Sequence, residues 1–110
     1  MVDVNEGFEI MKKKFNKAVA QEFKKRLVVT YDIKGDGGGI WQVIFDQGSM
    51  QFVEGDKESA PLKFHYDNAE TFVGMLKGEI DNIQAFTQGR LSIEGPIPVA
   101  LKVGEFFKPK

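Results

Sequence analysis

Residues 72–95, F-V-G-M-L-K-G-E-I-D-N-I-Q-A-F-T-Q-G-R-L-S-I-E-G, decide how the chain folds. Apolar side chains at helical spacing predict a helix that ends at Gly78, since glycine readily takes the backbone conformation of a helix end. A shorter apolar turn follows to Gly89, and alternating residues then predict a strand that ends at Gly95. The stretch is mostly hydrophobic residues and glycine, which favours a packing role over bond-making chemistry.

The composition indicates an ordinary globular protein with an excess of phenylalanine. The 110 residues are 42% hydrophobic and 28% charged, and they include 10 Phe against 2 Tyr and 1 Trp. This length predicts a single domain, residues 1–110. The absence of cysteine excludes disulfides, thiol catalysis and thiolate metal sites. No apolar run approaches the roughly 20 residues of a membrane span, and no signal peptide is evident, so we expect a cytoplasmic location.

The elements that flank residues 72–95 complete an α+β pattern. An amphipathic helix over 5–23 comes first, capped by Asn5 and bent or broken at Asn16. Pro98 begins a final helix. This order predicts a mostly antiparallel sheet with helices on one face. Alternating residues predict four strands before the central stretch: 26–34, 40–46, 49–54 and 62–66.

Turn and cap residues sharpen the boundaries of these elements. Gln47-Gly48 predicts a tight hairpin turn between two strands. Asp67 or Asn68 is expected to cap the helix that leads to Gly78. The short turn after Gly78 is expected to pack through three apolar residues: Ile80, Ile83 and Phe86.

Candidate catalytic and cofactor motifs are incomplete. The glycine-rich run at residues 35–39 lacks the Lys-Ser/Thr of a phosphate loop and precedes a strand, so a hairpin explains it better. His65 is the only histidine and lies on the outward face of its strand. One histidine without cysteine assembles neither a catalytic triad nor a zinc site. We therefore expect no enzymatic activity, no metal and no cofactor.

A basic segment at residues 12–26 has two interpretations. It carries a net charge of +6, and the remainder of the chain balances it. The simpler interpretation is a solvated helix face, and the alternative is transient contact with an anionic membrane or an acidic partner. Nucleic-acid binding is not expected, because basic and aromatic residues do not alternate on a strand. The membrane contact would use four lysines: Lys12, Lys13, Lys14 and Lys17.

Motifs along most of the chain resemble one known family. Residues 85–95 read A-F-T-Q-G-R-L-S-I-E-G, close to A-F-x-Q-G-x-L-x-I-x-G. Gly39, Trp41 and Val43, followed by Gly48, fit G-x-W-x-V-x-x-x-x-G. Both motifs, with the helix that ends at Gly78, resemble the sterol carrier protein type two domain over residues 39–107.

This resemblance implies a fold and a function. The implied fold is a five-stranded, mostly antiparallel sheet covered by helices on one face, with a hydrophobic tunnel between them. The implied function is non-enzymatic binding and carriage of a fatty acid, a fatty acyl-CoA or a sterol-like lipid. Gln88 is the polar member that could meet a ligand head group. By resemblance, seven residues line the tunnel: Phe72, Leu76, Phe86, Gln88, Ile93, Ala100 and Leu101.

Two other functions remain open beside the free carrier. The family is often fused to enzymes, so the chain could be an accessory module that presents a lipid substrate to a partner enzyme or supports its assembly. The third is an enzyme in its own right, against which the single His65 argues.

Overall fold

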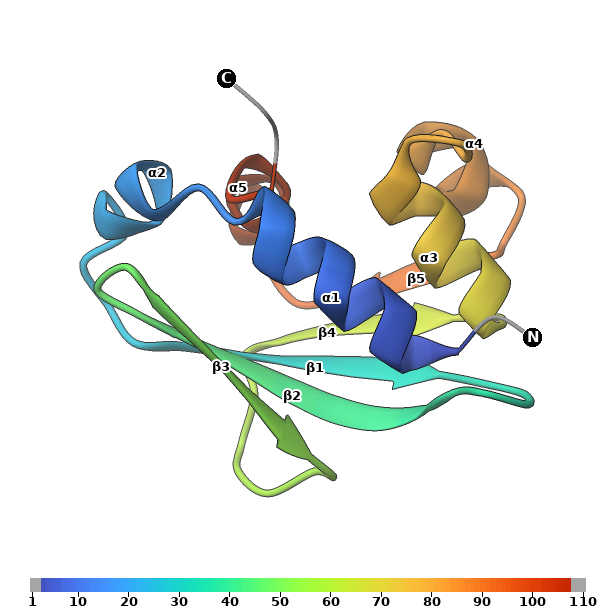
Figure 1. Cartoon of the computed structure of the whole chain (residues 1–110), viewed down its shortest axis with the longest axis horizontal. Helices are drawn as coiled ribbons and strands as arrows, with labels where there is room; N and C mark the ends of the chain where they lie inside the picture. Colours follow the sequence, from blue (N-terminus) through green and yellow to red (C-terminus); the bar gives the residue numbers. More distant parts are fainter. Residues whose placement is uncertain (1–2, 108–110) are drawn as a thin grey trace.

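Five strands form one mixed sheet in the computed structural model, which describes residues 3–107 (Figure 1). The strand order is β3-β2-β1-β4-β5. The central pair β1–β4 is parallel, and the other three pairs are antiparallel. The strands are β1 (Leu27–Ile33), β2 (Gly39–Asp46), β3 (Ser49–Glu54), β4 (Leu62–Tyr66) and β5 (Leu91–Glu94).

All the helices lie on one face of this sheet (Figure 1). The α+β class, the five strands and the one-sided helical cover were therefore predicted correctly. The helices are α1 (Val4–Lys14), α2 (Lys17–Gln21), α3 (Ala69–Lys77), α4 (Asn82–Thr87) and α5 (Ile97–Glu105).

The N-terminal helix agrees with its prediction in one respect and departs from it in another. The segment predicted as one helix over 5–23 is two helices, and Asn16 starts the second by accepting a hydrogen bond from the Val19 N–H. The break at Asn16 was foreseen, but the cap at Asn5 was wrong. Asp3 caps α1 instead, because its carboxylate accepts from the Asn5 and Glu6 N–H groups.

The turns and later caps agree with the sequence pattern. Gln47 and Gly48 have φ of 50° and 92°, which matches the two-residue turn that suits the twist of a hairpin. Asn68 caps α3, and Gly78 ends it with φ of 80°. The last helix begins at Ile97, so Pro98 lies in its first turn rather than at its start.

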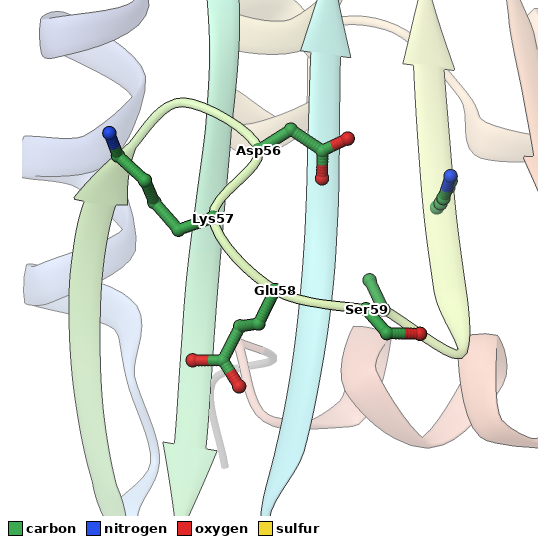
Figure 2. A pocket seen from close by; sticks show the side chains of 6 residues that line it. Asp56, Lys57, Glu58 and Ser59 are labelled. Atoms are coloured by element: carbon green, nitrogen blue, oxygen red, sulfur yellow. The ribbon is translucent and has the colours of Figure 1, made fainter.

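The connection from β3 to β4 covers part of the face that the helices leave open. It starts at the end of the edge strand β3 and must cross β2 and β1 to reach β4. Figure 2 looks onto this face and shows the connection running in front of the strands, with the helices behind. Residues under it are buried although their alternation points them away from the helices, as with Thr30 and Gln42.

Candidate functional site

The inner face of the sheet carries a group of aromatic rings around Phe72, which we call the Phe72 cluster. Phe72, from α3, lies 5.1 Å from the Tyr66 ring, 5.8 Å from Tyr31 and 5.7 Å from Phe8, measured between ring centroids. These rings come from two strands and two helices and hold the layers together. The cluster consists of Phe8, Tyr31, Trp41, Phe52, Phe64, Tyr66 and Phe72.

A second aromatic group lies under α2 and α5. Phe106 is fully buried and lies 5.1 Å from the Phe45 ring of β2. Phe15, between α1 and α2, reaches both Phe45 and Phe107 at about 6 Å. The sheet therefore presents two aromatic areas to the helices, one below α1 and α3 and one below α5.

The seven residues predicted to line a tunnel divide into two sets. Phe72 and Ala100 are buried in the main core cluster, and Leu76 and Ile93 pack against it in partly exposed positions. The structure thus brings these four to the inner layer from α3, β5 and α5. The other three residues are exposed on α4 and α5: Phe86, Gln88 and Leu101.

The exposed members carry much apolar surface into solvent. Phe86 is 50% exposed and Leu101 is 68% exposed. Ile83 and Ile97, on the same two helices, are 73% and 48% exposed. The expectation that Ile83 and Phe86 pack the turn after Gly78 was wrong, because Ala85 is the buried residue of α4.

A polar pocket lies on the other side of the sheet. Figure 2 shows Asp56, Lys57, Glu58 and Ser59 along the crossing connection, on the helix-free face. The remaining lining residues are Ala60 and Lys63. Charged groups of both signs surround it, so it does not suit an oily ligand, and the hydrophobic tunnel stays a prediction.

Gln42 holds the floor of this polar region in place. Its side chain has no exposed surface, and its Nε2 lies 2.8–3.1 Å from the Thr30 hydroxyl, the Asp56 carboxylate and the Glu58 carbonyl. Its Oε1 accepts from the backbone N–H groups of Lys57 and Glu58 at 3.0 and 3.1 Å. A buried amide with all its groups paired fixes the connection against the sheet.

An exposed ion pair fastens the same connection at its edge. The two terminal guanidinium nitrogens of Arg26, Nη1 and Nη2, each donate to the Glu58 carboxylate at 2.8 Å. These hydrogen bonds raise the pKa of Arg26 and lower the pKa of Glu58. Both groups are largely in water, so the pair orders the connection more than it stabilises the fold.

His65 lies on the helix-free face between two carboxylates. Its Nδ1 is 2.9 Å from Asp32 Oδ2, and its Nε2 is 2.7 Å from Glu94 Oε1. The sequence predicted its outward direction but missed both partners, because Asp32 and Glu94 come from strands distant in the chain. The acidic residues at outward positions of the neighbouring strands were the feature of the sequence that could have indicated these partners. A neutral imidazole carries one N–H, so it donates to only one of these two carboxylates at a time.

Both tyrosines of the chain lie in the Phe72 cluster. Tyr31 and Tyr66 are 4% and 7% exposed, and their rings stack with centroids 6.3 Å apart. Burial raises the pKa of both phenols, and their proximity raises that of Tyr31 further. They are therefore neutral at physiological pH and can donate hydrogen bonds.

Two of the four predicted membrane lysines are engaged within the molecule. The Lys14 ammonium donates to the Leu76 carbonyl in the last turn of α3. Lys12 pairs with Glu9 at 3.3 Å and lies 5.5 Å from the centre of the Phe52 ring. Lys13 and Lys17 are exposed, so they are the better placed for an outside contact.

Residues 3–107 contain neither a candidate metal site nor a candidate membrane span. In this range, no three His, Asp or Glu side chains come close enough to form a metal site. None of the helices described there has the length and apolarity needed to cross a bilayer.

The chain is similar to known proteins both in its sequence pattern and in its fold. The family model described as the SCP-2 sterol transfer family matches residues 8–108. No curated protein sequence matches the chain.

Several solved structures share the fold at low sequence identity. The sec-alkylsulfatase Pisa1 from Pseudomonas sp. matches with a TM-score of 0.69 and 16% identity, over 86% of this chain and 14% of its own. The chain therefore spans a small part of that enzyme. The ubiquinone synthesis protein UbiJ-SCP2 matches with a TM-score of 0.68 and 14% identity, over 89% and 86% of the two chains. Palmitated SCP2L2 from Aedes aegypti matches with a TM-score of 0.61 and 20% identity, over 91% and 92%.

Proposed function

Because the chain belongs to the SCP-2 sterol transfer family, we propose that it binds a fatty acid, a fatty acyl-CoA or a sterol-like lipid between its sheet and helices. The carrier would be cytoplasmic and would release its ligand unaltered. The observation that carries the proposal is the Phe72 cluster, an aromatic layer joined to Leu76 and Ile93 at the margin of the core. Palmitate in the Aedes aegypti relative supports a fatty-acyl ligand.

The energetics permit this binding without a strong polar contact. Each buried methylene contributes about 0.8 kcal/mol, so about ten contribute roughly 8 kcal/mol before the cost of association. A permanently empty cavity of about 300 Å³ would cost roughly 7 kcal/mol, which is comparable to the stability of a whole domain. We therefore propose that the ligand opens a space that side chains occupy in its absence.

The direct test is to identify lipid in the purified protein. Native mass spectrometry and organic extraction should recover a lipid in stoichiometric amount. After delipidation, palmitic acid should raise the midpoint of thermal unfolding. Finding no lipid together with no shift from fatty acid, acyl-CoA or sterol would refute the carrier function.

The exposed tunnel candidates allow a test of where the ligand enters. We propose that Phe86, Gln88 and Leu101 lie at the entrance and that Phe86 becomes covered when the ligand is held. In a Trp41→Phe background, a tryptophan at position 86 (Phe86→Trp) should shift its emission to the blue on addition of palmitic acid. The control Ile83→Trp, on the same helix, should not shift. Equal responses at both positions would remove Phe86 from the site.

A second candidate function is that of an accessory module. The similarity to UbiJ-SCP2, a ubiquinone synthesis protein, favours it. The module would present a lipid substrate to a partner enzyme or support its assembly. Affinity purification from the native cell, followed by size-exclusion chromatography, should then give a complex that persists after delipidation. Isolation of the free chain alone would argue for the carrier.

A further inference from the structure

The hydroxyl groups of Tyr31 and Tyr66 have no protein partner within residues 3–107. Both side chains are more than nine-tenths buried, and a buried phenol normally finds a hydrogen-bond partner. No fully enclosed side-chain oxygen in the described residues lacks a partner. Each hydroxyl must therefore border a space that a water-sized group can reach, which leaves two unpaired polar groups at the margin of an apolar interior.

The two residues form one unit. They come from the central parallel pair, where Tyr66 lies opposite Ile33, two residues beyond Tyr31 on the same face. Their rings are nearly parallel, with an interplanar angle of 4°. Side chains on parallel strands lean in the same direction along the strand, so the two hydroxyls are expected to point the same way.

This unit adjoins the proposed lipid site. Phe72 packs against both rings. Phe64, which contacts both tyrosines, is the strand partner of Ile93. The unit therefore adjoins the buried tunnel candidate Phe72, whereas Gln88 lies exposed at the end of α4.

We propose that Tyr31 and Tyr66 together donate hydrogen bonds to the carboxyl oxygens of a free fatty acid whose chain lies along Phe72 and Ile93. This inference rests on the lipid-binding function proposed above and narrows its ligand. Two donors satisfy two oxygens that would otherwise be buried unpaired. Two hydroxyl donors match the two oxygens of a free carboxyl group, whereas the thioester of an acyl-CoA offers a single carbonyl oxygen, so the unit favours the free acid.

Phenylalanine variants test the proposal, because they remove only the hydroxyls. Binding of palmitic acid and of hexadecane, which has the same chain length without a head group, is measured for the wild type, Tyr31→Phe, Tyr66→Phe and the double variant. Palmitic acid affinity should fall about 5-fold for each hydroxyl removed. Hexadecane affinity should not change. Circular dichroism and thermal unfolding establish that each variant is folded.

A spectroscopic measurement needs no variant. The chain has only these two tyrosines, so labelling with 13Cζ-tyrosine gives two assignable resonances. Palmitic acid should move both resonances, and hexadecane should move them much less.

The outcomes separate the inference from the function on which it rests. Wild-type protein that binds palmitic acid, with a double variant that binds it equally well, overturns the inference alone. Equal losses of palmitic acid and hexadecane affinity also overturn it, since they indicate altered packing. Wild-type protein that binds neither probe overturns the inference and the carrier function together.

Discussion

Gln42 is a single residue on which a whole connection depends. Replacing it with alanine removes five hydrogen bonds from a position without exposed surface and leaves a cavity. We expect Gln42→Ala to lower the free energy of unfolding by about 2–4 kcal/mol. Urea denaturation followed by circular dichroism measures this change.

The neighbouring strand provides a matched control. Gln51 is the exposed strand partner of Ile44 on β3, so Gln51→Ala should change stability by no more than about 0.5 kcal/mol. Similar losses for the two variants would contradict the structural role of the Gln42 network.

The buried tyrosines predict a loss of stability at alkaline pH. Burial raises the pKa of both phenols above the value of about 10 that they have in the unfolded chain. The unfolded state therefore releases these protons first. Their contribution should be intact below about pH 10 and fall by about 1.4 kcal/mol per pH unit for each tyrosine above it.

Urea denaturation at about pH 8 and about pH 11 measures this loss. The double variant Tyr31→Phe/Tyr66→Phe keeps the lysines, which also titrate in this range, and should lose less stability than the wild type. Equal losses would show that the two phenols ionise freely in the folded protein.

For single residues, the sequence predicted the face of the sheet on which a side chain lies, but not the groups that surround it. Strand alternation pointed His65 away from the helices, and His65 lies on that face, as Gln42 does. It did not reveal that Gln42 is covered or that His65 contacts Asp32 and Glu94. Those facts depend on a crossing connection and on strand order, which periodicity in one segment does not encode.

At the level of elements, the contact between α1 and α3 depends on a glycine. A Cβ at Gly7 would lie 2.3 Å from the Phe72 ring. Gly7→Ala should therefore destabilise the protein by about 1–3 kcal/mol, although alanine favours helix by about 1 kcal/mol. In α5, Gly104 has nothing within 4 Å of the same position, so Gly104→Ala should stabilise by up to about 1 kcal/mol.

Thermal and urea unfolding of the two glycine variants provide the comparison. Opposite signs are expected for the same chemical change, because only Gly7 faces another helix at close range. Stabilisation by both substitutions would mean that the Phe72 ring can move away from the new methyl group without a loss of free energy of unfolding.

The sequence predicted the boundaries of helices and strands correctly where alternation or a turn or cap residue marks them clearly. The predicted strands 49–54 and 62–66 coincide with β3 and β4, and Gly78 ends α3 as expected. Asn16 was a recognisable interruption, but Asp3 was overlooked as the cap of α1. Ile83 and Phe86 were assigned to the core because α4 is apolar. Nothing within this short helix shows that its apolar side faces outward.

At the level of the whole molecule, the charge distribution predicts weak attraction to anionic membranes. Lys13 and Lys17 are exposed on the helical layer, and a lysine near an anionic surface contributes about 1 kcal/mol. Lys13→Gln/Lys17→Gln should weaken binding to phosphatidylserine vesicles roughly 30-fold at low salt, since two lysines contribute about 2 kcal/mol. The control Lys57→Gln/Lys63→Gln makes the same charge change at the polar pocket on the opposite face and should bind as the wild type does.

Vesicle sedimentation at low and physiological salt measures both variants. The wild-type affinity should fall as salt rises. If the control loses as much affinity as the helical-layer variant, net charge rather than a docking face controls the binding.

The family, the class of fold and the one-sided helical cover followed from the sequence. The parallel pairing of β1 with β4 at the centre of the sheet did not. The local pattern of each strand is compatible with either direction, and the pairing depends on where the long connection leads.

That central pairing also sets an order of events in folding. β1, β2 and β3 form a meander of neighbouring segments, whereas each β1–β4 pair joins residues that are far apart in the chain. Contacts between distant segments form later, because a longer loop must close first. We expect amides of the meander to be protected before those of β4 and β5 in pulse-labelled hydrogen exchange. During synthesis, the edge of β1 would then stay unpaired until the C-terminal half of the chain is available to complete the sheet.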